Sequence, residues 1–293
     1  MKKQKAGRAA KSDLAKRNIY KFMTNRLAII GLILIILILV VSLLAPVLTP
    51  YDPNALDTAN RYQAPSGAHL LGTDQLGRDL LTRLFYGGRV SIFVGFVSAA
   101  VTAVIGVVLG CISGYLGKRL DAVIVYISEI FTAFPQTLLI FILVGFVGQG
   151  IGNLILIFAL TGWTSIYRLV RSRILSLKEE PFIESCRANG IGNSSIMFRH
   201  MLPNTIGPVI VNVTLLTAGY LLQESALSFL NIGVPADIPT WGNILNAAKN
   251  LTVIQNYPVM WIGPGVAISL FVLGVNFLGD GLRDVLDLHK GGW

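Results

Sequence analysis

A run of apolar residues from Leu27 to Leu48, without one charged side chain, constrains this chain more than any other feature. The hydrocarbon core of a bilayer is about 30 Å thick, and a helix of about 20 apolar residues crosses it. The composition points the same way, because 53% of the residues are hydrophobic and 13% are charged, whereas soluble domains carry roughly a quarter charged residues. The sequence therefore predicts an integral membrane protein.

Six segments of the chain are long and apolar enough to span a membrane. The first has a longer apolar run than the core of a signal peptide, and the residues 45–47 that follow make a poor cleavage site, so we expect it to remain as a helix. The predicted fold is all-α, a polytopic membrane protein with six transmembrane helices. The segments are 27–48, about 90–115, about 122–146, about 154–175, about 205–230 and about 260–278.

The positive charges orient these spans. If the N-terminus is cytoplasmic, the cytoplasmic parts (1–26, about 116–121, about 168–203 and 282–293) hold 19 of the 24 Lys and Arg residues, and the exterior parts hold 5. Because the cytoplasmic loops of membrane proteins are enriched in Lys and Arg, this split predicts that both termini are cytoplasmic. The net charge of +9 is then explained without a nucleic-acid partner.

This topology divides the chain into five parts. Within the extracytoplasmic loop, the leucines of 75–87 share a helical face, so we expect an amphipathic helix that lies on the outer membrane surface. A second exterior stretch predicts a short helix, 241–250, with Trp241 as an interfacial anchor. The parts are a basic cytoplasmic segment (1–26), a first transmembrane helix (27–48), the extracytoplasmic loop (49–89), a five-helix core (90–281) with a cytoplasmic loop at 178–203, and a cytoplasmic tail (282–293).

The cytoplasmic loop 178–203 carries signals for two short helices. Pro181 suits the first position of a helix and Gly190 suits the position just past its end. Asn193 can cap a second short helix, which must stop before Pro203. Two short helices joined by a glycine turn would form a rigid protrusion, and a cytoplasmic motor could push against such a protrusion.

The spacing in this loop resembles the EAA loop of binding-protein-dependent ABC importer permeases. Small residues, Ser185 and Cys186, stand where the family usually has alanine, and His200 stands where isoleucine or valine is usual. The residues that match in register are Glu184, Gly190, Leu202 and Pro203.

Two further stretches resemble signatures of the oligopeptide/dipeptide/nickel permease family. The first is 71–79, continuing to Arg83, Gly87, Arg89 and Ser91, and the second is 224–230 followed by 239–242. Together with the loop, the three signatures cover almost the whole chain in the family's order. Within the family the chain is similar to the "C" type of permease, which has a short first exterior loop.

The resemblance implies an ABC importer type I permease fold in a bacterial cell membrane. It implies a heterodimer with a second permease, one or two ATPase subunits that bind ATP and Mg, and an extracytoplasmic solute-binding protein. The solute would be a di- or oligopeptide, and nickel or another metal chelate remains the alternative. The ATPase-coupling loop would consist of Glu184, Ser185, Cys186, Gly190, Leu202 and Pro203.

Enzymatic function is not expected from the sequence. The chain has no GxxxxGK[ST] motif, so ATP hydrolysis must lie on partner chains. There is no HExxH motif, and Cys111 and Cys186 have no metal-binding spacing. A secondary transporter driven by an ion gradient is less favoured, because we see no internal repeat.

Three residues in or near the predicted spans are candidates for the solute pathway or for an interface. Ionisable groups at membrane depth are costly and functional by default. For Glu129 a pathway position and a structural position are equally open, and for Glu224 we favour a structural role at the interface with the partner permease. Pro135 should kink the third span, either as a gate hinge or, as we favour, as a static bend.

Overall fold

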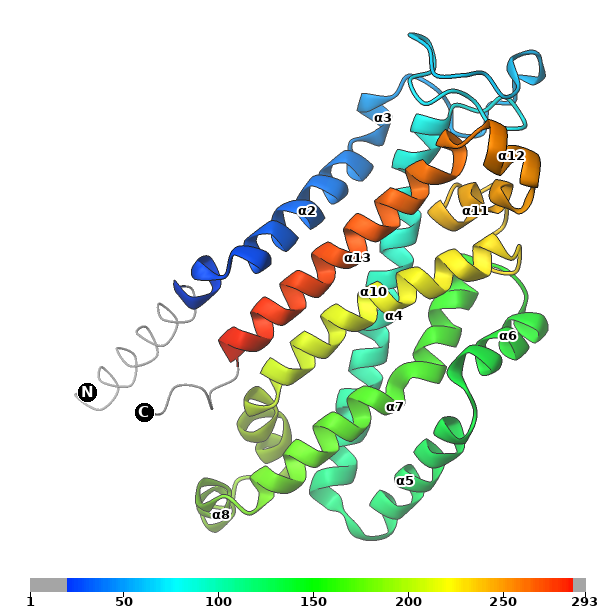
Figure 1. Ribbon diagram of the computed structural model, residues 1–293. Coiled ribbons are helices and arrows are strands. Elements are labelled where there is room, and N and C mark those ends of the chain that lie inside the picture. Colours follow the sequence, from blue (N-terminus) through cyan, green and yellow to red (C-terminus); the bar gives the residue numbers. More distant parts are fainter. Residues whose placement is uncertain (1–19, 287–293) are drawn as a thin grey trace.

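Helices make up most of the computed structural model, which describes residues 20–286 (Figure 1). Within that range five helices are long and apolar enough to cross a membrane, and two shorter helices, α5 and α6, which meet at an angle of 89°, make a sixth when they are counted as one span. The all-α fold with six spans is thus confirmed. The spanning elements are α2 (Arg26–Leu43), α4 (Leu80–Leu116), α5 (Lys118–Ala133) with α6 (Gln136–Val147), α7 (Ile151–Lys178), α10 (Ile206–Phe229) and α13 (Val259–Leu286).

Short helices fill the connections between the spans. Most of the predicted basic segment 1–26 and part of the tail 282–293 lie outside the described residues. The short elements are α3 (Ala45–Leu48), η1 (Thr58–Asn60), α8 (Pro181–Ala188), α9 (Asn193–Ser195), η2 (Ile196–Met201), η3 (Leu202–Asn204), α11 (Trp241–Leu245), η4 (Asn246–Lys249) and α12 (Leu251–Asn256).

The second span begins ten residues earlier than the sequence predicted. Asp79 caps α4, because its carboxylate accepts a hydrogen bond from the Thr82 backbone N–H at 2.7 Å. Arg83 is buried and donates to the Pro53 carbonyl at 2.8 Å. The expected amphipathic helix on the membrane surface is therefore wrong: 80–87 are the first turns of α4, and the preceding loop folds over their polar side chains.

Trp241 is also not the interfacial anchor that we expected. Its side chain is buried, and the indole N–H donates to the Leu84 carbonyl of α4 at 2.9 Å. The predicted short helix 241–250 is present as α11 followed by η4. The exterior stretch is thus packed against the start of α4.

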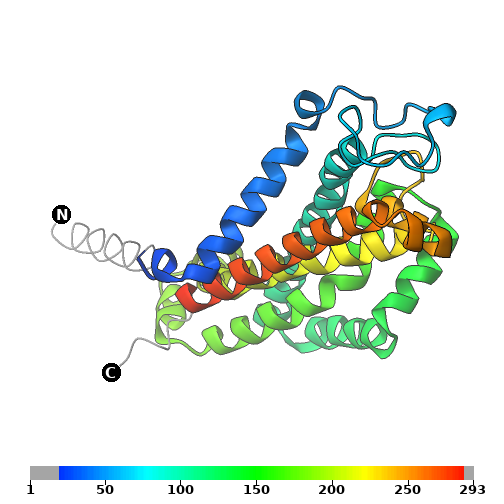
Figure 2. The same cartoon turned by 45° about the horizontal axis from the view of Figure 1, so that its top comes forward.

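Helices α4 and α7 approach each other closely. A Cβ added at Gly106 would lie 2.6 Å from the Ile166 side chain, and one at Gly110 would lie 2.8 Å from Val170. The same holds for α2 and α13, which run alongside each other in Figure 1 and diverge away from the N-terminal end of α2 in Figure 2, since a Cβ at Gly31 would lie 2.5 Å from the Gly274 carbonyl oxygen. Small residues let helix backbones pack this tightly within a membrane.

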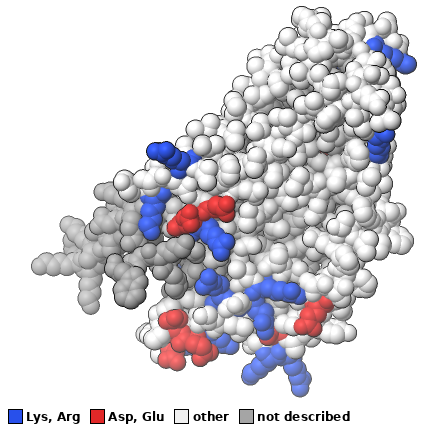
Figure 3. Space-filling model, viewed as in Figure 1, with Lys and Arg blue, Asp and Glu red and all other residues white. Residues whose placement is uncertain are grey.

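The molecule has two distinct ends. We call the end with α8 and the start of α5 the α8 end, and the opposite end, with the loop 49–79 and α11 and α12, the loop end (Figure 1). Figure 3 shows charged side chains gathered at the α8 end and a broad band without charge on the same face. A band of this kind fits the hydrocarbon region of a bilayer.

Candidate functional site

The predicted protrusion is present at the α8 end. Helix α8 begins at Pro181 and ends at Ala188, with Pro181 in the first turn. Gly190 follows with a φ of +72°, a backbone conformation that side chains with a Cβ rarely adopt. Both sequence signals are thereby confirmed, and they fix a sharp turn directly after α8.

The second half of the loop differs from the prediction. Gly192, not Asn193, stands at the cap position, and no side chain caps α9. The Asn193 side chain instead accepts a hydrogen bond from the Tyr115 hydroxyl at 2.9 Å. Pro203 lies within η3, after which α10 begins at Ile206, so the predicted stop is displaced by only a few residues.

A buried apolar cluster holds the protrusion onto the membrane helices. Ile183 of α8 is fully buried, as are Ile196 and Met201 of η2. They pack with Val170 and Ile174 of α7 in one cluster that also contains Cys111 of α4. Because cluster members come from both halves of the loop and from three spans, α4, α7 and α10, a displacement of α8 must shift the neighbouring ends of these spans as well.

Tyr115, near the end of α4, is a second anchor that the sequence analysis missed. Besides its hydrogen bond to Asn193, its ring lies below the Arg187 guanidinium, 5.6 Å from the ring centroid, and near the Lys178 ammonium at 5.9 Å. These cation–π contacts add attraction between α4 and both α8, through Arg187, and the end of α7, through Lys178. No motif marks Tyr115 in the sequence, because its partners lie 63 to 78 positions away.

The residues predicted for the coupling loop divide into an exposed and a half-buried group. Glu184, Ser185, Gly190 and Pro203 are exposed, whereas Cys186 and Leu202 are half-buried against the cluster. Phe182 and Phe198 are also exposed, each at 42%. The outer face of the loop therefore offers a carboxylate, a hydroxyl and two aromatic rings to a partner.

The two other signatures meet in space at the loop end. The Glu224 carboxylate of α10 accepts hydrogen bonds from Ser91 of α4 and from Ser228, both at 2.8 Å. The Trp241 backbone N–H donates to the same Ser91 hydroxyl at 3.2 Å. One buried carboxylate thus joins α4 and α10, and the Ser91 hydroxyl extends this hydrogen-bonded group to α11.

Glu224 itself is fully enclosed by its own chain, with 0% of its surface exposed. The structure therefore does not place Glu224 at a surface that a partner permease could contact, contrary to the prediction. A buried carboxylate needs hydrogen-bond donors, and the hydroxyls of α4 and α10 supply them. Its structural role is internal to the chain.

The other two pathway candidates lie on the bent span. Glu129 of α5 is exposed, and no hydrogen bond of its carboxylate is found among residues 20–286. Pro135 lies between α5 and α6, at the 89° bend. The predicted kink at Pro135 is confirmed. It is larger than a bend within one helix, because α5 and α6 are two separate helices.

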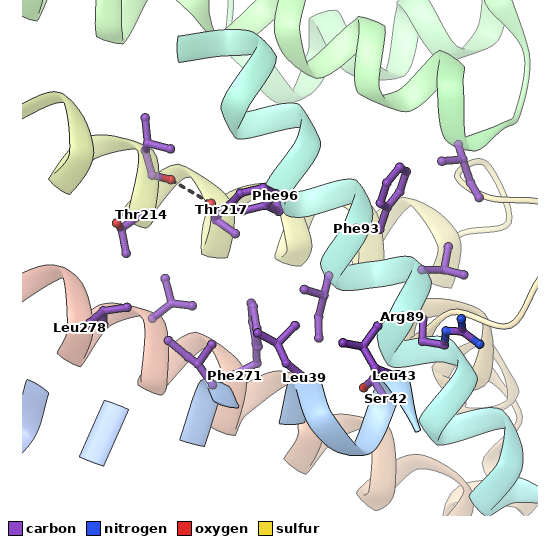
Figure 4. A pocket seen from close by; sticks show the side chains of 16 residues that line it. Leu39, Ser42, Leu43, Arg89, Phe93, Phe96, Thr214, Thr217, Phe271 and Leu278 are labelled. Atoms are coloured by element: carbon purple, nitrogen blue, oxygen red, sulfur yellow. Dashed lines mark hydrogen bonds between the residues drawn. The ribbon is translucent and has the colours of Figure 1, made fainter. Parts of the chain in front are cut away.

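A cavity of about 700 Å³ lies among α2, α4, α10 and α13 (Figure 4). Its walls are mainly apolar, with Phe93, Phe96 and Phe271 among them, and its polar groups include Arg89 and Thr217. None of the three pathway candidates lines it. Within residues 20–286, no three His, Cys, Asp or Glu side chains come close enough together to hold a metal ion.

These features define a class of protein: a polytopic α-helical membrane protein with an anchored helical protrusion between its fourth and fifth spans. Residues 106–290 match the family model described as binding-protein-dependent transport system inner membrane component. The chain belongs to this family. Residues 14–65 match the N-terminal TM domain of oligopeptide transport permease C.

Relatives along nearly the whole chain agree with this assignment. The chain is 41% identical over 263 residues to the dipeptide transport system permease protein DppC of Alkalihalophilus pseudofirmus, covering 90% of this chain and 86% of the relative. It is 36% identical over 275 residues to the oligopeptide transport system permease protein OppC of Bacillus subtilis, covering 94% and 90%. DppC of Haemophilus influenzae is 36% identical over 274 residues, covering 92% of both chains.

Proposed function

We propose that this chain is the transmembrane permease subunit of an ABC importer for di- and oligopeptides. The names of its relatives, which are dipeptide and oligopeptide permeases, favour peptides over the nickel or metal-chelate alternative. The chain itself is non-catalytic, and ATP and Mg are bound by partner ATPase subunits. The observation that carries the proposal is a short helix, α8, with an exposed outer face, anchored by a buried cluster to three membrane spans.

In this proposal the ATPase subunits bind the outer face of the loop 178–203. Glu184 and Ser185 contact the ATPase directly, and Gly190 sets the angle at which α8 is presented. Cys186 and Leu202 pack inward and keep the loop on the apolar cluster, while Pro203 ends it. Closure of the ATPase dimer pushes α8, and the cluster and Tyr115 transmit the push to α4 and α7.

The α8 end then lies in the cytoplasm, with both termini. The charge gathered at that end (Figure 3) supports this orientation, because Lys and Arg are retained on the cytoplasmic side. The loop end faces outward and receives an extracytoplasmic solute-binding protein. By linkage, docking of loaded binding protein outside should raise ATP hydrolysis inside.

A second permease subunit completes the pathway in a heterodimer. Many large apolar side chains on the spans are exposed, such as Val123 and Ile130 on α5 and Phe93 on α4. In a membrane protein such faces are covered by lipid or by another helix.

Replacing Gly190 with proline tests this function. Proline cannot adopt the φ of +72°, and it removes the N–H that donates to the Arg187 carbonyl at 3.0 Å. In proteoliposomes with the second permease, the ATPases and the binding protein, Gly190→Pro should lower peptide uptake and binding-protein-stimulated ATP hydrolysis by about tenfold or more.

Gly192→Ala is the matched control. Gly192 has a φ of −64° and no atom near the position of an added Cβ, so this variant should behave as wild type. Normal ATP-driven uptake by Gly190→Pro, at a normal amount of assembled importer, would contradict the role assigned to the loop.

A further inference from the structure

Among the spanning helices, α5 is the one that the rest of the chain buries least. Of its residues, Ser128 is the only one that is buried within the described part of the chain. At one end α5 meets α6 at the 89° break beside Pro135. At the other end it follows α4 through a sharp turn in which Gly117 and Lys118 both have positive φ. A helix about 24 Å long, with so few apolar contacts, depends on specific polar contacts for its position.

The strongest of these contacts joins Asp121 of α5 to Arg171 of α7. The guanidinium Nε and Nη2 each donate to one carboxylate oxygen, both at 2.6 Å. Bidentate pairs of this kind fix direction as well as distance. The side chains are 18% and 29% exposed, so the pair is partly shielded from water and is not a freely solvated surface pair.

Two neighbours build the pair into the bundle. The Ser113 hydroxyl of α4 donates to the same Asp121 carboxylate and is within hydrogen-bond distance of the Tyr167 hydroxyl of α7, at 2.9 Å. A carboxylate of α5 is thereby held by side chains of α4 and α7 together. We call Asp121 and Arg171 the latch.

The latch lies close to the protrusion along α7. From Arg171 to the end of α7 at Lys178 is about two helical turns, or about 10 Å, and α8 begins at Pro181. Val170 and Ile174, on either side of Arg171, belong to the cluster that anchors α8. Any shift of α8 that moves this stretch of α7 therefore also moves the guanidinium that holds α5.

Further along, α5 has two weaker contacts with α7. The Arg168 guanidinium donates to the Thr132 hydroxyl at 2.8 Å, and the Phe131 ring meets the Trp163 ring edge-on with centroids 5.9 Å apart. Both contacts lie near the break at Pro135, where a rotation of α5 about the break would displace the helix only slightly. The other end of α5, at the latch, is joined to α4 through Gly117.

We propose that Asp121 and Arg171 are a positioning pair that transmits movement of the coupling loop to α5. This inference rests on the proposed function, in which ATPase subunits move α8. With the latch closed, α5 follows α7 and swings about the break at Pro135, opening or closing the passage beside it. Without the latch, α8 and α7 still move, but α5 follows them less, because only its turn to α4 and the weaker contacts near Pro135 still join it to them.

Distance measurements by electron spin resonance can separate these movements. Spin labels carried by an unnatural amino acid, which leave Cys111 and Cys186 unchanged, are placed at Ile127 on α5 and at Asp237 at the loop end. A second sample is labelled at Ala188 on α8 and at Asp237. All three sites are exposed. Each sample is the full importer in lipid with binding protein and a mixture of di- and tripeptides, measured without nucleotide and after trapping with ATP and vanadate.

In the wild-type importer, trapping should change both distances. Asp121→Asn keeps the shape of the side chain but removes the charge that binds Arg171. We expect it to preserve the change measured from α8 and to reduce the change measured from α5 by about half or more. Arg171→Gln should do the same, and the double variant should be no worse than either single variant, because both remove one interaction.

Asp280→Asn is the matched control, since it makes the same aspartate-to-asparagine change at an exposed position of α13, away from α5 and α8, and its distances should match wild type. If α5 moves normally in Asp121→Asn, the positioning role is wrong. If α8 moves in the wild type while α5 does not, the latch inference fails and the proposed function stands. If α8 itself does not move, the proposed function fails.

Discussion

At the scale of single residues, Glu224 shows how an ionisable side chain can be placed in a membrane span. Its two carboxylate oxygens accept hydrogen bonds from Ser91 and Ser228, at 2.8 Å each, within a fully buried site. Ser91 in turn accepts from the backbone N–H of Trp241. Removing the carboxylate would leave buried hydroxyl donors without an acceptor and would also leave a void.

Glu224→Ala is therefore expected to destabilise the chain by about 2–4 kcal/mol. In purified protein this should appear as a fall of roughly 5–10 °C in the apparent melting temperature. Glu129→Ala, which removes a carboxylate that is exposed, should change the stability by less than about 0.5 kcal/mol. Equal effects of the two substitutions would show that the buried hydrogen bonds do not stabilise the fold.

At the scale of elements, the contact between α4 and α7 depends on glycine. Gly106, Gly110 and Gly114 face Ile166, Val170 and Ile174 at distances that leave no room for a Cβ. The two helices form the frame to which the coupling loop is attached. This contact must therefore stay tight if movement of α8 is to reach the rest of the molecule.

Gly110→Val should force α4 and α7 apart, because its first side-chain atom would already lie 2.8 Å from Val170 and 2.9 Å from the Tyr167 carbonyl oxygen. We expect a loss of about 1–3 kcal/mol, seen as a lower melting temperature and less folded protein in the membrane. Gly145→Val, at a glycine of α6 with nothing within 4 Å of an added Cβ, should be tolerated. A stable Gly110→Val variant would mean that the contact is not close-packed in the membrane.

The spans and the turn at Gly190 could be predicted from the sequence, because apolar runs, prolines and glycines act locally. The start of α4 could not, since the polar side chain of Arg83 suggested a membrane surface and its partner, the Pro53 carbonyl, lies 30 positions away. The same reason hid Tyr115 and the latch. Asp121 and Arg171 are 50 positions apart, and without knowledge of the fold each reads as an ordinary charge near the end of a span.

The meeting of the two outer signatures was likewise hidden. Ser91 and Glu224 are 133 positions apart, so the sequence could mark both as unusual but could not show that they bind each other. For Glu224 this changes the interpretation from a contact with another subunit to a contact within the chain. Local signals place helices well, whereas polar contacts between helices follow from packing.

At the scale of the whole molecule, the fold consists of a packed frame of helices and one helix, α5, that packs against this frame with few contacts. The frame is built from α4, α7, α10 and α13, and it contains the buried clusters. Helix α5 is exposed along most of its length, between a break and the latch. Such a molecule is suited to convert a push at one end into a swing of one helix, provided that a second permease covers the other side.

Photo-crosslinking tests the central claim most directly, namely that the outer face of α8 is bound by a partner ATPase in the cytoplasm. A photoreactive amino acid is placed at Ser185, in the middle of α8, or at Asp237, at the loop end, and both positions are exposed. In cells that make the complete importer, the probe at Ser185 should crosslink to an ATPase subunit, and the probe at Asp237 should not. Crosslinks to the ATPase from Asp237, or none from Ser185 while the importer remains active, would contradict the account.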